Sequence, residues 1–174
     1  MSLIEDAVEA LRFLPEDKQA VAVRGNPRLR REPRGARRHV AVHMQKDFDG
    51  WNKLKKAIDA SDDQRLYFHE GDIWWVRLGV NVGYEIDGKQ REFSRPVVVL
   101  RKYNQYSFLA LPLTTNDKPS KWRVAIGEVA GRQAFAVLSQ LRNIDSRRLI
   151  EKRGHVEAGL LAHLKKAASL MNFG

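Results

Sequence analysis

The sequence predicts a mainly β fold, a small barrel or sandwich with a helix before it and a helix after it. Three observations predict this fold class. From Leu66 onward the apolar residues alternate with a period near two, as in half-buried strands. Short strand-like runs follow one another at regular spacing, which is typical of barrels and sandwiches. Helical periodicity precedes and follows this region.

Turn-prone residues separate the strand-like runs. The runs cover residues 73–78, 95–101, 106–112, 122–126 and 134–138, and turns are predicted at residues 87–88, 103–104 and 116–117. Trp74 and Trp75 are neighbours in the first run, so their side chains must point to opposite faces of the sheet. We expect one of them to enter the core and the other to cover a helix or a dimer surface.

Two apolar stripes predict the flanking helices. Phe48, Trp51, Leu54 and Ile58 recur at steps of three, three and four residues, which places them on one face of a helix. A second helix is predicted over residues 157–171. The apolar residues on one face of that helix are Leu160, Leu161, Leu164, Ala167, Ala168 and Met171. Both stripes indicate packing against the strands.

The composition of the chain limits which binding partners and which cellular compartment we expect. A chain of 174 residues with 43% apolar residues suggests one domain plus extensions. The formal net charge of +10 favours a polyanionic partner, nucleic acid ahead of an anionic membrane. The chain has no cysteine, which excludes disulfides, thiolate metal sites and a cysteine nucleophile. With no secretory signal and no apolar run near the ~20 residues of a membrane span, we expect a cytoplasmic protein.

Residues 1–43 differ in composition from the rest of the chain. Short helices are predicted over residues 2–11 and 14–23. Residues 24–38 then hold seven arginines, one glutamate, two prolines and two glycines, so they cannot bury a core. This composition favours a solvated linker over an arm that clamps RNA. We therefore divide the chain into an extension, residues 1–43, and a domain, residues 44–174.

Five motifs in this domain carry a family resemblance. They are Gly-Asp-Ile-Trp-Trp-Val at residues 71–76, Asn-Val-Gly-Tyr-Glu at 81–85, Ser-Arg-Pro-Val-Val-Val-Leu at 94–100, Leu-Pro-Leu-Thr-Thr at 111–115, and Val-Leu-Ser-Gln-Leu-Arg-Asn-Ile-Asp at 137–145. In this order they resemble the MazF/PemK family of toxin endoribonucleases. Residues 46–56 resemble a longer PemK-like branch that has a helix before the barrel.

The resemblance implies a fold, an activity and partners. The fold would be a small SH3-like β-barrel of the MazF/CcdB type, with an N-terminal and a C-terminal helix. The protein would be the toxin of a type II toxin–antitoxin system, a homodimer that cleaves single-stranded RNA without a metal and binds a cognate antitoxin protein. Residues 1–43 would then be an antitoxin-like piece, an upstream fusion or a remnant of an expression vector.

The resemblance also implies catalytic residues. RNA cleavage without a metal uses the ribose 2′-OH as nucleophile. Arg95 can hold two phosphate oxygens and stabilise a phosphorane-like transition state, and Thr114 can donate its hydroxyl to a non-bridging oxygen. Glu85 could accept the 2′-OH proton if burial made its carboxylate basic enough. Alternatively, Glu85 orders its loop through an ion pair with Arg95 or Arg91.

RNA-binding residues are predicted around this catalytic group. Gln140 matches a family position that hydrogen-bonds a base, although a buried structural amide is the alternative. Asn81, Tyr84, Lys118 and Lys121 lie on two predicted mouth loops, where bases could stack and phosphates could be gripped. Each of these residue types is also common on ordinary loop surfaces.

Other chemistries lack a motif. The five histidines show no metal-ligand spacing, so the sequence predicts no metal and no cofactor. It also contains neither a P-loop nor the nucleophile elbow of a serine hydrolase. Two further functions stay open because a fold does not fix a function. They are a non-catalytic toxin of the same fold that inhibits DNA gyrase, and a basic RNA-binding module.

Overall fold

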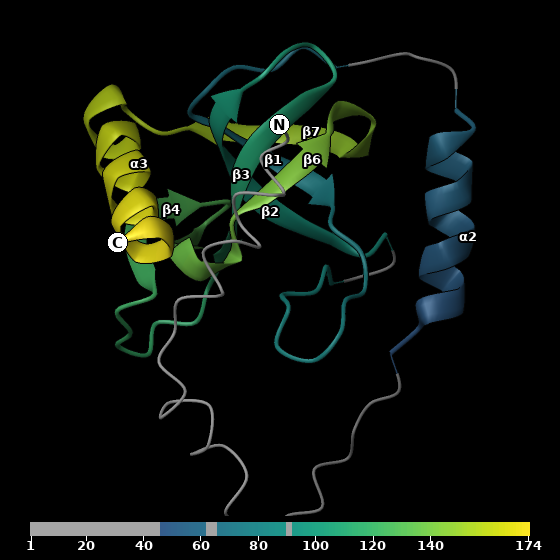
Figure 1. Cartoon of the computed structure of the whole chain (residues 1–174), viewed down its shortest axis with the longest axis horizontal. Coiled ribbons are helices and arrows are strands. Elements are labelled where there is room, and N and C mark those ends of the chain that lie inside the picture. Colours follow the sequence, from purple (N-terminus) through teal and green to yellow (C-terminus); the bar gives the residue numbers. More distant parts are fainter. Residues whose placement is uncertain (1–45, 62–65, 90–91) are drawn as a thin grey trace, which may run out of the picture. The chain divides into compact units, whose positions relative to one another are not determined.

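A computed structural model describes residues 46–61, 66–89 and 92–174 of the chain (Figure 1). The helices are α2 (Phe48–Asp59) and α3 (Ala158–Phe173). The strands are β1 (Asp72–Arg77), β2 (Ser94–Lys102), β3 (Ser107–Thr114), β4 (Arg123–Val129), β5 (Arg132–Val137), β6 (Arg142–Asp145) and β7 (Leu149–His155). Two short 3-10 helices, η4 (Leu138–Gln140) and η5 (Ser146–Arg148), flank β6.

All these elements lie in one compact unit, Met44–Gly174. The helices predicted over residues 2–11 and 14–23 and the arginine-rich segment 24–38 lie outside the described residues. The boundary proposed after residue 43 and the origin of residues 1–43 therefore stay predictions. Within the described residues, no helix has both the length and the apolar character that crossing a membrane would require.

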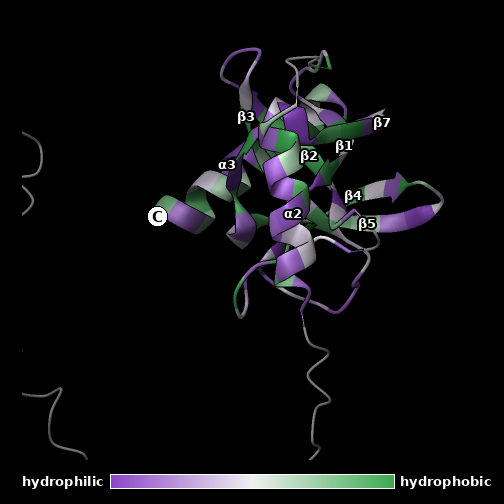
Figure 2. Cartoon of the chain, turned by 90° about the vertical axis from the view of Figure 1, so that its right-hand side faces the viewer, coloured by the Kyte–Doolittle hydropathy of each residue, from purple (hydrophilic) through white to green (hydrophobic). Residues whose placement is uncertain are grey.

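The strands form one curled antiparallel sheet in the order β4-β5-β3-β2-β1-β7. Strand β3 organises it, because one end pairs with β6 and the other end pairs with β5, while β2 runs along its side. Figure 1 shows the curl, with α3 beside the strands, and Figure 2 shows β4 and β5 extending as a hairpin. The predicted mainly β fold with flanking helices is confirmed.

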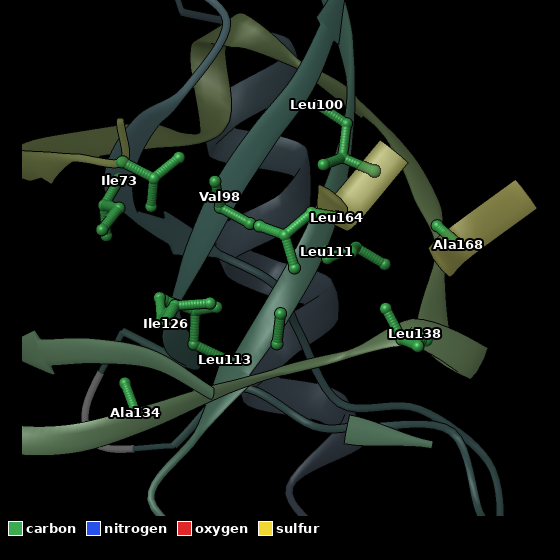
Figure 3. Close-up of a cluster of buried hydrophobic side chains, with 12 residues drawn as sticks. Ile73, Val98, Leu100, Leu111, Leu113, Ile126, Ala134, Leu138, Leu164 and Ala168 are labelled. Atoms are coloured by element: carbon green, nitrogen blue, oxygen red, sulfur yellow. The ribbon is translucent and has the colours of Figure 1, made fainter. Parts of the chain in front are cut away.

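Strand β2 is buried on both faces. Its Val98 and Leu100 belong to a core cluster that includes Leu164 and Ala168 of α3 (Figure 3). Val97 and Val99 face the other way, into a second cluster around Phe68 and Phe108. Alternate side chains of a strand point to opposite faces, so a continuous run of valines fills both clusters. This double burial fixes the position of the residues at the start of β2.

The five predicted strands are confirmed, with shifted ends, and two strands were not predicted. Strand β6 has only four residues between two 3-10 helices, which is too short for a periodic pattern. Strand β7 is an edge strand that pairs with β1 alone, and most of its side chains are exposed. Because β7 buries little, its sequence is mostly polar and lacks the alternation that marks the other strands.

The predicted C-terminal helix is confirmed, and its predicted apolar face packs on the core cluster of Figure 3. The stripe of α2 packs only in part. Trp51 is buried, Leu54 and Ile58 are partly buried, and Phe48 is 48% exposed. The prediction that Phe48 packs with the other three residues is therefore wrong. Phe48 stands in the first turn of the helix, one residue after the N-cap Asp47, whose carboxylate accepts from the Gly50 N–H.

The two adjacent tryptophans face opposite ways, as predicted. Trp74 is buried in the second core cluster, and its Nε1 donates to Asp72 at 3.4 Å. Trp75 is partly exposed and lies against a pocket at the junction of several strands instead of covering a helix. The alternative that it covers a dimer surface stays a prediction. Its place in the sheet follows from its pairing with Pro96 of β2.

Candidate active site

The pocket beside Trp75 has a volume of about 420 Å³. It is lined by residues of β1, β2 and β3 and by the β4–β5 hairpin. Its polar and charged lining residues are Lys89, Ser94, Arg95, Thr114, Thr115 and Arg132, and its apolar ones are Trp75, Pro96, Leu113, Val129, Ala130 and Ala134. No acidic residue of the described chain lines it, so its charged groups are all cationic.

Arg95 lies at the start of β2 and is buried. Its Nε donates to the Asp87 carbonyl at 2.6 Å, and its NH1 donates to the Leu113 carbonyl at 2.9 Å. Burial lowers the pKa of Arg95 from its ordinary value, and the nearby Asp87 carboxylate counters part of this effect. The hydrogen bonds use Nε and NH1, so NH2 keeps donors for a ligand in the pocket.

Thr114 ends β3, where it pairs with Phe135 of β5. Its Oγ1 accepts a hydrogen bond from the Asn116 N–H at 3.2 Å. A hydroxyl that accepts one bond still holds its own hydrogen and can donate it elsewhere. The structure therefore brings the predicted pair, Arg95 and Thr114, to one pocket, with a guanidinium donor and a hydroxyl donor available together.

Two cations of the pocket, Lys89 and Arg132, were not predicted from the sequence. Lys89 lies in the connection between β1 and β2, where its backbone exchanges hydrogen bonds of 2.6 and 2.8 Å with Ser94. Arg132 begins β5, directly after the turn Ala130–Gly131, in which both residues have positive φ. Neither side chain has an acidic partner in the described part of the chain. Both positions depend on hairpin geometry, which motif matching does not show.

Glu85 is placed outside this pocket. Its side chain is 57% exposed, and its carboxylate lies 3.7 Å from the NH2 group of Arg142. The predicted alternative, an ion pair that orders the loop, thus has Arg142 as its partner instead of Arg95, and Arg91 lies outside the described residues. The role of Glu85 as proton acceptor stays a prediction.

The side-chain amides of Gln140 and Asn81 hold the β1–β2 loop, residues 78–93. Gln140 accepts from the Ile86 N–H at 3.0 Å and donates to the Tyr84 carbonyl at 3.3 Å. Asn81 donates to the Ile86 carbonyl at 2.8 Å and accepts from Arg142 at 3.1 Å. These bonds match the alternative of a structural amide for Gln140. The predicted RNA contacts of both residues stay predictions.

The remaining predicted RNA-binding residues are exposed. Tyr84 is fully exposed at the tip of the β1–β2 loop. Lys118 and Lys121 stand on the loop between β3 and β4, and the Nζ of Lys121 lies 4.7 Å from the centre of the Trp122 ring. All three lie outside the pocket lining, so they can contact only parts of a ligand that extend beyond the pocket.

Residues 69–171 match the family described as "PemK-like, MazF-like toxin of type II toxin-antitoxin system". This segment is more than half of the chain and contains all the strands that the structure describes and most of α3. The chain belongs to this family. The pocket with Arg95 and Thr114 lies inside the segment that matches the family, whereas α2 precedes it.

Several solved structures are similar to the chain, and the first of them supports its fold. The MazF crystal structure from Deinococcus radiodurans has a TM-score of 0.52 and 23% identity, and covers 61% of this chain and 96% of its own. A MazE-MazF structure (Form-II) from the same organism has a TM-score of 0.48 and 20% identity, with coverages of 61% and 95%. An endoribonuclease in complex with its cognate antitoxin, from a mycobacterial species, has a TM-score of 0.46 and 13% identity, with coverages of 62% and 98%. No curated protein sequence matches the chain.

Proposed function

We propose that this toxin is an endoribonuclease that cleaves single-stranded RNA by attack of the ribose 2′-OH on the adjacent phosphate. One observation carries the proposal. Lys89, Arg95 and Arg132 surround a single pocket that has no acidic lining residue among those described. A cluster of cations without a counter-charge favours a bound anion, and the phosphates of RNA are such anions.

The pocket suits one nucleotide unit of a polymer. Its volume of about 420 Å³ is within the range of small-ligand sites. Trp75 adds an aromatic ring to the lining, and aromatic rings stack on unpaired bases. Beyond the pocket, Tyr84, Lys118 and Lys121 extend the contact to neighbouring bases and phosphates, and Gln140 hydrogen-bonds a base.

The reaction divides among three residues. The 2′-oxygen bonds to phosphorus while the bond to the 5′-oxygen breaks, which leaves a 2′,3′-cyclic phosphate and a 5′-hydroxyl. Arg95 neutralises the charge that develops on the phosphorane oxygens, and Thr114 donates to a non-bridging oxygen. The leaving 5′-oxygen takes a proton from water, and Glu85 accepts the proton of the 2′-OH. To do so, its carboxylate must exchange Arg142 for the RNA, because the two now lie 3.7 Å apart.

The partners follow from the family. Its members are toxins of toxin–antitoxin systems, and we propose a cognate antitoxin as the protein partner and a homodimer as the active assembly. RNA would then bind across the face that two protomers share. Analytical ultracentrifugation of the full chain, alone and with RNA, tests the assembly.

Arg95→Ala tests the reaction. We expect it to reduce the cleavage of single-stranded RNA in EDTA by at least 10²-fold, since a donor to the developing oxyanion contributes about 3 kcal/mol. Mass spectrometry of the wild-type products should show cyclic-phosphate and 5′-hydroxyl ends. Arg95→Lys controls for the loss of a buried charge. Arg153→Ala removes an arginine of β7 that lies away from the pocket lining, so it controls for the general effect of losing one positive charge.

Full activity of a folded Arg95→Ala protein would overturn the proposal. Arrest of DNA gyrase by the wild type with RNA left intact would favour the non-catalytic toxin. Salt-sensitive RNA binding without products would favour the RNA-binding module.

A further inference from the structure

The segment at the start of α2 contacts both arms of the β1–β2 loop. The first arm leaves β1 and contains Gly79 and Asn81, and the second arm leads to β2 and contains Asp87 and Phe93. Trp51 lies against Gly79 on the first arm, where a Cβ would overlap the indole ring. The same ring meets Phe93 on the second arm edge to face, with 5.8 Å between the ring centres. Since α2 precedes the residues that match the family, these contacts come from outside the matched domain.

Lys46 joins the two arms more directly. Its Nζ donates to the Asn81 carbonyl on the first arm at 2.7 Å and lies 2.7 Å from the Asp87 carboxylate on the second. The other oxygen of that carboxylate accepts from the Asn81 N–H at 2.7 Å. Lys46, Asn81 and Asp87 therefore form a closed arrangement across the neck of the loop, and the Lys46 side chain is only 27% exposed within it.

Asp87 connects this arrangement to the pocket. While its carboxylate faces Lys46 and Asn81, its carbonyl accepts the Nε hydrogen bond of Arg95 at 2.6 Å. The remaining hydrogen bond of Arg95, to the Leu113 carbonyl, holds NH1 alone. Two anchors fix a planar guanidinium in orientation, whereas one leaves it free to rotate. A shift of Asp87 would thus release Arg95 from its second anchor.

We propose that Lys46 is a positioning residue, which acts through Asp87 to hold Arg95 in the orientation that the reaction needs. The loop has other ties, such as the Gly88 N–H to the Gly79 carbonyl at 2.7 Å, and the Asn81 N–H binds one oxygen of the Asp87 carboxylate. Among the described residues, only Lys46 pairs with the other oxygen of that carboxylate, at 2.7 Å. The consequence for catalysis rests on the proposed function, and the consequence for the position of Arg95 does not.

An exchange experiment on the full chain tests the position of Arg95 without RNA. In wild type, NMR should show slow hydrogen exchange at Arg95 Nε and at the amides of Asn81 and Gly88. Lys46→Ala should speed exchange at these sites at least tenfold, and Lys46→Arg should restore slow exchange, because arginine can also bridge a carboxylate and a carbonyl. Lys53→Ala, an exposed α2 lysine without an ion pair to any described residue, should change nothing.

Kinetics test the consequence for the reaction. Lys46→Ala should lower kcat roughly tenfold, because small misplacements of a catalytic group are costly. KM should change less than twofold, because Lys89 and Arg132 still bind the phosphate chain. Adding Asp87→Asn should lower kcat little further, because the two side chains act as one contact.

Unchanged exchange at Arg95 Nε in a folded Lys46→Ala protein would overturn the role of Lys46. So would a failure of Lys46→Arg to restore slow exchange. If wild type cleaves no RNA, the proposed function fails, and the exchange experiment still decides whether Lys46 positions Arg95.

Discussion

Arg95 donates its hydrogen bonds to two main-chain carbonyls, which are uncharged and do not pair with its positive charge. The carbonyls of Asp87 and Leu113 fix the guanidinium without neutralising it, as a carboxylate in direct contact would. Burial lowers its pKa, but an arginine starts from a value so high that it stays protonated at neutral pH. The protein thus keeps a positive charge at the pocket that is available to a phosphate.

Lys89 and Arg132 should contribute to RNA affinity through counterion release. We expect Lys89→Ala and Arg132→Ala each to weaken the binding of a cleavage-resistant 2′-deoxy oligonucleotide. Each should also reduce the slope of log affinity against log salt by about 0.7. Fluorescence anisotropy across a salt series measures both effects. Lys166→Ala, an exposed lysine of α3, is the matched control and should leave the slope unchanged. An unchanged slope in both pocket variants would remove these residues from the phosphate path.

Arg95 and Thr114 could be predicted because each lies in an unbroken motif at a strand end. Lys89, Arg132 and Trp75 could not, because their position depends on how strands pair. Arg132 enters the pocket lining through the Ala130–Gly131 turn, whose residues both have positive φ. Asn-Gly or Asp-Gly marks such turns in a sequence, whereas alanine in the first position gives little signal.

At the scale of elements, the β1–β2 loop is where the sequence was least informative. Asn81 of this loop and Gln140 of η4 are predicted to contact RNA, yet the amides of both bond to the loop backbone. Backbone groups in a long connection need partners, and side chains that supply them look the same in a sequence as side chains that bind a ligand. The strands around the loop were predictable because burial imposes a period on them, and β7 was not because it is exposed.

The contact between α2 and this loop can be tested at Gly79. Gly79 and Gly83 both have positive φ, at +95° and +56°, but only Gly79 touches Trp51. Gly83→Ala should lower the free energy of unfolding by about 1 kcal/mol, the backbone cost alone. Gly79→Ala should cost roughly 1–3 kcal/mol more, because its φ lies farther from the left-handed region that alanine tolerates and its methyl group displaces the indole. Urea unfolding measures both. Equal losses of unfolding free energy in the two variants would show that Trp51 of α2 does not pack against the loop in solution.

One buried carboxylate, that of Asp72, links β1 and β7, the first and last strands along the described chain. Asp72 begins β1 and accepts from Lys152 Nζ at 2.6 Å, while its other oxygen accepts from the His69 N–H at 3.0 Å. His155, at the end of β7, lies 3.0 Å from the first oxygen through its Nδ1. This carboxylate gathers the Lys152 ammonium and the His155 ring at the opposite end of β1 from Arg77. Its ionisation therefore affects the fold apart from the pocket.

Asp72 should make the stability of the fold depend on pH. Burial alone would raise the pKa of Asp72, but the hydrogen bonds from Lys152, His155 and the His69 N–H, together with the charge of Lys152, outweigh burial and lower it. A lowered pKa gives stability that is complete above the unfolded value of about 3.9 and is lost as pH falls through the folded value. Asp72→Asn should thus cost about 2–3 kcal/mol near pH 5, and clearly less near pH 3. Urea unfolding at both pH values measures this, with the exposed Asp117→Asn as control. If the loss of unfolding free energy in Asp72→Asn is as large near pH 3 as near pH 5, then the charge of Asp72 does not stabilise the contact between β1 and β7.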